Sequence, residues 1–194
     1  MKNISPKSAL VSLSDKTNLD LLVSFLLERN VEIISTGGTY KAIKKITDNV
    51  IEVSEYTGHK EMMDGRVKTL HPKIHAGILA RRGEDADELK SMDYKEIDIV
   101  VVNLYPFEET IKSGCSFEEA IEQIDIGGPT MIRAAAKNFK DVLVLSDPND
   151  YEEMISEWNS KNGISYEFRK KQATKVFKKM SQYNRAIHQY IDSE

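Results

Sequence analysis

The chain has little cysteine, no long apolar run and no excess of one charge. Its single cysteine, Cys115, excludes an intrachain disulfide and predicts a reducing compartment. The longest apolar run, residues 97–105, is too short to cross a bilayer, and residues 1–16 lack the apolar stretch of a signal peptide. The 27 Lys and Arg against 31 Asp and Glu give a net charge of −4, without a field that attracts nucleic acid or a membrane. We therefore expect a cytoplasmic protein without nucleic-acid or membrane partners, in which local basic groups bind any anionic ligand.

Short apolar runs alternate with helical patterns five or six times along the 194 residues. The expected strands are residues 9–13, 31–35, 50–53, 74–80, 97–104 and 142–145. This alternation predicts an α/β fold: a Rossmann-like, three-layer parallel sheet with helices on both faces. Residues 1–149 form the expected core, and residues 150–194 a helical appendage of the same catalytic domain.

Several local signals refine this outline. Asp15 can cap a helix over residues 17–29, and Asn30 can end it in the left-handed conformation. Pro129 is suited to the first position of a helix that runs to residue 139. Residues 55–74 have weak periodicity and predict a long functional loop. The basic run 169–171 fits the solvated face of a helix.

Three turns that follow predicted strands share hydroxyl groups or glycines just before a helix. They span residues 12–16 (SLSDK), 35–39 (STGGT) and 125–130 (DIGGPT). Glycine lets the backbone approach a ligand, and a helix N-terminus favours an anion. Any one turn could be an ordinary helix cap. Three at one edge of a parallel sheet predict a site for a phosphate-bearing small molecule.

Two further segments carry polar groups that fit this site. Arg66 and Lys68 alternate in residues 65–73, so in an extended loop they point to the same side; an exposed basic loop is the alternative. Asn103 and Tyr105 end the most apolar strand, although Tyr105 could also be packed at the sheet edge.

Other candidates are weaker. Lys137 follows four residues after Arg133 on the last helix of the core, where such cations are usually solvated, but it could point back along a ligand. His71 and His75 lack the glutamate of a zinc motif, and Cys115 has no histidine beside it, so we expect no metal site and an inert thiol.

The motifs SLSDK, STGGT, GRVKTLHPKIHAGIL, NLYPF and EQIDIGGPTMIRAAAKNF occur in this order. Together they resemble the IMP cyclohydrolase domain of the bifunctional purine-biosynthesis enzyme AICAR transformylase/IMP cyclohydrolase. The resemblance implies a methylglyoxal-synthase-like fold and conversion of 5-formamidoimidazole-4-carboxamide ribotide (FAICAR) to IMP and water. It also implies a homodimer and no cofactor or metal.

The resemblance also assigns roles to residues that match the family's motifs. Lys68, Tyr105, Asp125 and Lys137 match its proposed catalytic groups. The implied nucleotide-binding residues are Ser12, Ser14, Asp15, Lys16, Ser35, Thr36, Gly37, Gly38, Thr39, Arg66, Val67, Thr69, Asn103, Ile126, Gly127 and Gly128.

Ring closure explains why such groups are needed. A carboxamide is a poor nucleophile, so a base must take its proton while fixed donors stabilise the oxyanion that forms. Our hypothesis is that Lys68, kept neutral by nearby Arg66, assists deprotonation and that Tyr105 donates to the oxyanion. Asp125 and Lys137 would act as a coupled pair in the loss of water.

Two departures from the family limit the transfer. Nothing in the sequence corresponds to the transformylase domain, so formyl transfer is not expected. Residues 177–184 (FKKMSQYN) replace the family's F-x-H-T-A-x-Y-D, and we expect this segment to lie outside the site. The alternatives are a non-catalytic nucleotide- or phosphate-binding module, as in carbamoyl-phosphate synthetase, and a lyase like methylglyoxal synthase.

Overall fold

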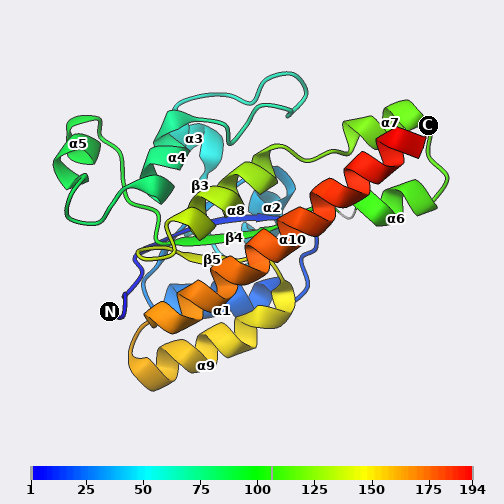
Figure 1. Cartoon of the computed structure of the whole chain (residues 1–194). Helices are drawn as coiled ribbons and strands as arrows, with labels where there is room; N and C mark the ends of the chain where they lie inside the picture. The colour runs from blue at the N-terminus through cyan, green and yellow to red at the C-terminus, as the bar shows by residue number, and fades with distance from the viewer. Residues whose placement is uncertain (1, 106, 194) are drawn as a thin grey trace.

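The computed structural model describes residues 2–105 and 107–193, and within them five parallel strands form one sheet in the order β3-β2-β1-β4-β5 (Figure 1). The strands are β1 (Ser8–Leu13), β2 (Glu32–Ser35), β3 (Ile51–Glu52), β4 (Ile99–Asn103) and β5 (Leu143–Leu145). β1 lies at the centre, paired in parallel with β2 and β4. The predicted α/β fold with a parallel sheet is confirmed.

Helices connect successive strands, as parallel pairing requires. They are α1 (Leu19–Glu28), α2 (Gly37–Ile43), α3 (Val53–Thr57), α4 (Pro72–Leu79), α5 (Ala86–Ser91), α6 (Phe107–Lys112), α7 (Phe117–Glu122), α8 (Gly127–Lys137), α9 (Tyr151–Lys161) and α10 (Tyr166–Ser193), with a 3-10 turn η1 (Pro148–Asp150).

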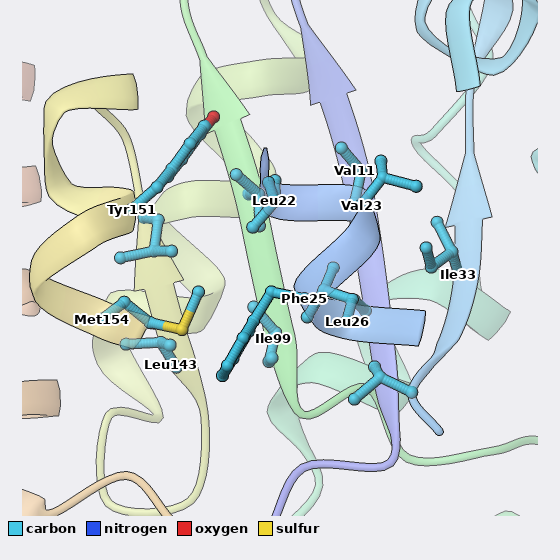
Figure 2. Close-up of a cluster of buried hydrophobic side chains, with 14 of the residues drawn as sticks. Val11, Leu22, Val23, Phe25, Leu26, Ile33, Ile99, Leu143, Tyr151 and Met154 are labelled. Atoms are coloured by element: carbon cyan, nitrogen blue, oxygen red, sulfur yellow. The ribbon is translucent and has the colours of Figure 1, made fainter. Parts of the chain in front are cut away.

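The two faces of the sheet bury separate hydrophobic clusters. Alternate residues of β1 point to opposite faces: Val11 joins the cluster under α1 and α9 (Figure 2), and Leu10 joins the cluster under α4, α8 and α10. β4 is buried along its whole length, as expected for a strand covered on both faces. The three layers hold the carboxyl ends of β1, β2 and β4 in fixed register.

The helices after residue 150 pack against opposite faces of the sheet. α9 contacts α1, whereas α10 crosses the other face against α8 and β5 and reaches α6 (Figure 1). Arg169 of α10 is 1% exposed, so its predicted place on a solvated face is wrong. Its guanidinium donates hydrogen bonds to the carbonyls of Phe139, Lys140, Ile164 and Lys2. The planar group with five donors suits this set of carbonyls from separate segments.

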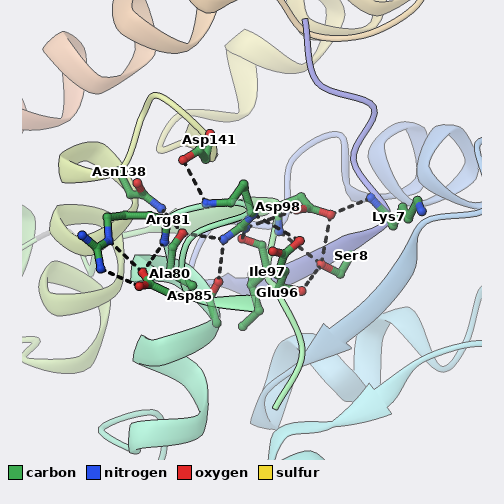
Figure 3. Close-up of polar contacts among 12 residues, drawn as sticks. Lys7, Ser8, Ala80, Arg81, Asp85, Glu96, Ile97, Asp98, Asn138 and Asp141 are labelled. Carbon is green, nitrogen blue, oxygen red and sulfur yellow. Dashed lines mark hydrogen bonds and ion pairs between the residues drawn. The ribbon is translucent and has the colours of Figure 1, made fainter. Parts of the chain in front are cut away.

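A polar network closes the amino ends of β1 and β4 (Figure 3). One carboxylate oxygen of Asp98 accepts from the amide of Lys7 at 2.8 Å, and the other lies 3.2 Å from the guanidinium of Arg82. Asn138 donates to the carbonyls of Ile78 and Ala80. These contacts lie at the end of the sheet where ligands do not bind in such folds, so we assign them to stability.

Some local predictions are wrong at identifiable points. The expected strand 74–80 is wrong: residues 74–79 belong to α4, because Pro72 occupies the first position and the ring of His71 accepts from the amide of Lys73. α1 begins at residue 19 rather than 17, and Asp15 bonds Thr17 instead of capping the helix. The left-handed Asn30, with φ of 56°, is confirmed. α8 begins two residues before Pro129, and α6 was not predicted.

Candidate active site

A cleft of about 550 Å³ opens at the carboxyl ends of β1, β2 and β4. Its volume lies within the range of small-molecule sites. The predicted residues that line it are Ser12, Ser14, Lys16, Thr36, Gly37, Gly38, Thr39, Arg66, Lys68, Thr69, Asn103, Tyr105, Asp125, Ile126, Gly127 and Gly128. The three turns and the basic loop therefore meet in one place.

The turn after β1 is held by the side chain of Asn103 at the end of β4. Its oxygen accepts from the amides of Ser14 and Asp15 at 2.7 and 3.1 Å, and its nitrogen donates to the carbonyl of Asp15 at 2.7 Å. The ammonium of Lys16 donates to the carbonyls of Leu13 and Ser14. Asn103 is 8% exposed, and these hydrogen bonds show that its side chain stabilises the turn.

The turn after β2 is tied to β1 by hydroxyl groups. The hydroxyl of Thr39 bonds both the amide and the carbonyl of Leu13, at 2.8 and 3.0 Å, and the hydroxyls of Ser12 and Thr36 lie 2.8 Å apart. Gly37 has a φ of +44°, in the left-handed region that favours glycine. The backbone of this turn faces the cleft without a side chain at Gly37 or Gly38.

The basic loop brings Arg66 and Lys68 to the cleft, each paired with a carboxylate. The Nζ atom of Lys68 lies 2.7 Å from a carboxylate oxygen of Glu61. The Nε atom of Arg66 lies 3.4 Å from a carboxylate oxygen of Glu122. The hydrogen bond from Lys68 lowers the pKa of Glu61 below its ordinary value. Lys68 therefore lies in the cleft as one partner of an ion pair.

Asp125 caps the first turn of α8 at the floor of the cleft. Its carboxylate accepts from the amide of Gly128 at 2.9 Å, and burial raises the pKa of its carboxyl group. A β-carbon on Gly128 would stand 2.3 Å from a carboxylate oxygen of Asp125, so only glycine leaves room here. A β-carbon on Gly127 would likewise come too close to the side chain of Thr69. These two contacts explain the two glycines of the GGP sequence.

Tyr105 is 53% exposed and lines the cleft, rather than being packed under the sheet edge. Its carbonyl accepts from the amide of Phe107 at 2.9 Å, which joins it to the start of α6. Pro106, the intervening residue of the NLYPF motif, lies outside the described residues.

Four predicted site residues lie outside the lining of the cleft. Ser35 is buried and donates to the carbonyl of Val11, while Asp15 bonds Thr17. Val67 pairs through its backbone with Met62. Lys137 is exposed at the far end of α8.

Lys137 and Asp125 are separated by the length of α8. Gly127 begins the helix at the cleft and Lys137 ends it, and at about 1.5 Å per residue this spans about 15 Å. A lysine side chain reaches less than half of that distance. Within one chain, the structure does not bring Lys137 to Asp125.

The structure adds residues that the sequence alone did not indicate. The end of α7 and the segment after it line the cleft with Ile121, Glu122, Gln123 and Ile124, and Met131 of α8 lines it as well. Tyr183 of α10 accepts a hydrogen bond from the amide of Asp125 at 2.9 Å. None of residues 177–184 lines the cleft, as expected, but Tyr183 contacts the backbone of Asp125 from outside it.

The histidines, cysteine and acidic residues within residues 2–105 and 107–193 do not gather into a metal site. No group of three or more His, Cys, Asp or Glu residues there could hold a metal ion. His71 and His75 instead make local contacts in α4. Among the described helices, none has the length and apolar character needed to cross a membrane.

Two known protein families match successive parts of the chain. The MGS-like domain family matches residues 19–130, more than half of the chain, and the chain belongs to this family. The remaining C-terminal part, residues 135–194, matches the AICARFT/IMPCHase bienzyme family.

The similar curated proteins are bifunctional purine biosynthesis proteins PurH. Those of Clostridium acetobutylicum and Fusobacterium nucleatum are each 54% identical to this chain, over 95% and 97% of its length. The chain spans 38% of either relative. The crystal structure of ForH is 33% identical, covers 94% of this chain and 97% of its own, and has a TM-score of 0.80. The resemblance to the purine-biosynthesis family is confirmed.

Proposed function

We propose that the chain is an IMP cyclohydrolase that closes the ring of FAICAR to give IMP and water. The observation that carries the proposal is the half-buried carboxyl group of Asp125, which shares the cleft with Tyr105 and Lys68. Its raised pKa lies closer to neutral pH than that of an ordinary aspartate, as suits a group that takes up and returns a proton. The identity to the PurH proteins supports the same reaction.

The turns after β1 and β2 suit the phosphate of the substrate. The amides at Gly37 and Gly38 begin α2, and the hydroxyls of Ser12 and Thr36 face the same cleft. Backbone N–H groups at a helix start carry partial positive charge, to which Lys16 and Arg66 add full charges. The reacting groups would then lie toward Tyr105 and Asp125.

The reaction joins two groups of one molecule. The carboxamide nitrogen attacks the formyl carbon and loses a proton to Asp125. The formyl oxygen becomes an alkoxide, which Tyr105 and Lys68 stabilise. After this formyl oxygen is protonated, it leaves as hydroxide while the formamido nitrogen forms the C=N bond of the ring and loses its own proton. The hydroxide takes up that second proton, so one water is released. Because the attack is unimolecular, holding the two groups in contact supplies much of the acceleration.

Lys137 can join this chemistry only from another copy of the chain, because α8 separates it from Asp125. We propose a homodimer in the cytoplasm, and within it Lys137 would act in the partner's cleft. Light scattering measures the dimer, and mixing inactive Asp125→Asn and Lys137→Ala chains tests the exchange. Recovered activity in the mixture supports a shared site, and no recovery contradicts it.

The function is tested by incubating the purified chain with FAICAR and following IMP formation by ultraviolet absorbance. We expect turnover by the wild type and a loss of at least about 100-fold in Asp125→Asn, the scale of a lost general base. Asp87→Asn, at an exposed residue of α5, is the matched control and should retain activity. Binding of FAICAR without turnover would indicate the nucleotide-binding module, and turnover of a triose phosphate alone would indicate the lyase.

A further inference from the structure

Tyr183 connects the long C-terminal helix to the residue on which the proposed chemistry depends. Its hydroxyl oxygen accepts from the backbone amide of Asp125 at 2.9 Å, across 58 residues of sequence. The carboxylate of the same Asp125 is held by the amide of Gly128 on the opposite side. Asp125 is therefore fixed at both its backbone and its side chain.

The ring of Tyr183 is itself fixed. It is half-buried and meets the ring of Phe107 edge to face, with centroids 6.3 Å apart and an interplanar angle of 72°. Burial raises the pKa of the Tyr183 hydroxyl, and the nearby charge of Asp125 raises it further. The hydroxyl is neutral at physiological pH and remains an acceptor for the amide.

Phe107 extends this support to the other side of the cleft. Its amide bonds the carbonyl of Tyr105, and its ring also meets Tyr190 of α10 edge to face. Tyr183 and Tyr190 of α10 therefore both contact Phe107, whose amide bonds Tyr105, and Tyr183 also contacts Asp125. Loss of the Tyr183 hydroxyl would leave the amide of Asp125 without its acceptor while the ring contacts persist.

We propose that Tyr183 is a positioning residue of the site, whose hydroxyl holds the backbone of Asp125 so that its carboxylate meets the reacting groups. The kinetic part of this inference rests on the proposed cyclohydrolase function. Displacement of a reacting group by about 1 Å can cost about 100-fold in rate, so a partial loss of anchoring should cost less than that. The helix α10 thereby supports a residue of the cleft without lining it.

The test is Tyr183→Phe, which removes one oxygen and keeps the ring. We expect kcat to fall about tenfold with KM for FAICAR within about twofold, because the hydroxyl acts on a reacting group rather than on substrate affinity. Tyr166→Phe is the matched control: it removes a hydroxyl from the same helix, where the ring lies against Phe139. It should leave both constants unchanged.

Two readouts separate positioning from a structural role. In an Asp125→Asn background, Tyr183→Phe should lower the residual rate by less than twofold, because a residue that acts through Asp125 has nothing left to position. NMR titration of the Asp125 carboxyl group should show a shifted midpoint in Tyr183→Phe, because the burial that raises its pKa depends on where the backbone of Asp125 is held.

The outcomes are distinguishable from failure of the function itself. If the wild type does not form IMP, the cyclohydrolase proposal fails, and the NMR midpoint still decides whether Tyr183 controls Asp125. If the wild type is active, wild-type kcat in Tyr183→Phe, an equal loss in both backgrounds, or an unchanged midpoint would overturn the inference.

Discussion

The ammonium nitrogen of Lys68 lies 3.1 Å from the position that a β-carbon on Gly37 would occupy. The turn after β2 and the basic loop are thus fitted to each other, although 31 positions separate the two residues in the sequence. Gly37 has φ of +44°, so the contact combines a backbone requirement with a steric one.

Replacement of Gly37 by alanine should destabilise the fold. Placing a β-carbon in the left-handed region costs about 1–2 kcal/mol, and the end of Lys68 must also move. The melting temperature should fall by about 2–8 °C for a chain of this size. Gly38→Ala is the control for stability, because its β-carbon would meet open space. Equal melting temperatures for the two variants would contradict the account.

Glu61→Gln should tighten substrate binding. The carboxylate of Glu61 competes with an anionic substrate for Lys68, and exposed pairs of this kind contribute about 0.2–1 kcal/mol. We therefore expect KM for FAICAR to fall by up to about fivefold, with the larger effect at low salt. Glu55→Gln, at another exposed glutamate, serves as the control. A higher KM in Glu61→Gln would mean that Glu61 helps the loop to bind substrate.

The pH dependence of stability should report on Asp125. Its pKa is raised in the fold, so between the unfolded value near 3.8 and the higher folded value the native state binds more protons than the unfolded state. The contribution of Asp125 to the free energy of unfolding is therefore present below pH 3.8 and decreases as pH rises through the folded pKa. Denaturant unfolding of wild type and Asp125→Asn at a series of pH values should show the variant gaining relative stability from pH 4 to pH 7. A constant difference would contradict the raised pKa.

Arg169 should be among the residues on which the fold depends most. Arg169→Met removes the donor to the buried carbonyl of Ile164 and to the part-buried carbonyls of Phe139 and Lys140, and an unsatisfied buried group costs about 1–3 kcal/mol. We expect a loss of at least about 3 kcal/mol in denaturant unfolding. Lys170→Met makes the same loss of charge at an exposed neighbour and should change stability by less than about 0.5 kcal/mol.

The sequence was most informative where local chemistry repeats. Strand ends could be found because apolar runs stop at hydroxyl and glycine residues, and parallel pairing brings those ends together. Residues 74–79 form a helix rather than the expected strand. A short apolar run does not distinguish a buried strand from a buried helix, and Pro72 begins the helix here.

Contacts between distant segments could not be predicted from one sequence. Nothing near Arg169 indicates that four carbonyls surround it, and nothing near Tyr183 indicates the amide of Asp125. The separation of Lys137 from Asp125 could not be predicted from the motif either. The matching residue types do not show that the two residues lie at opposite ends of α8.

The central claim is that ring closure takes place in the cleft at the carboxyl ends of β1, β2 and β4. A crystal structure of the chain with IMP tests it most directly. We predict the phosphate against residues 36–39 and the six-membered ring next to Tyr105 and Asp125. IMP bound elsewhere, or bound here with its phosphate toward Asp125, would contradict the account.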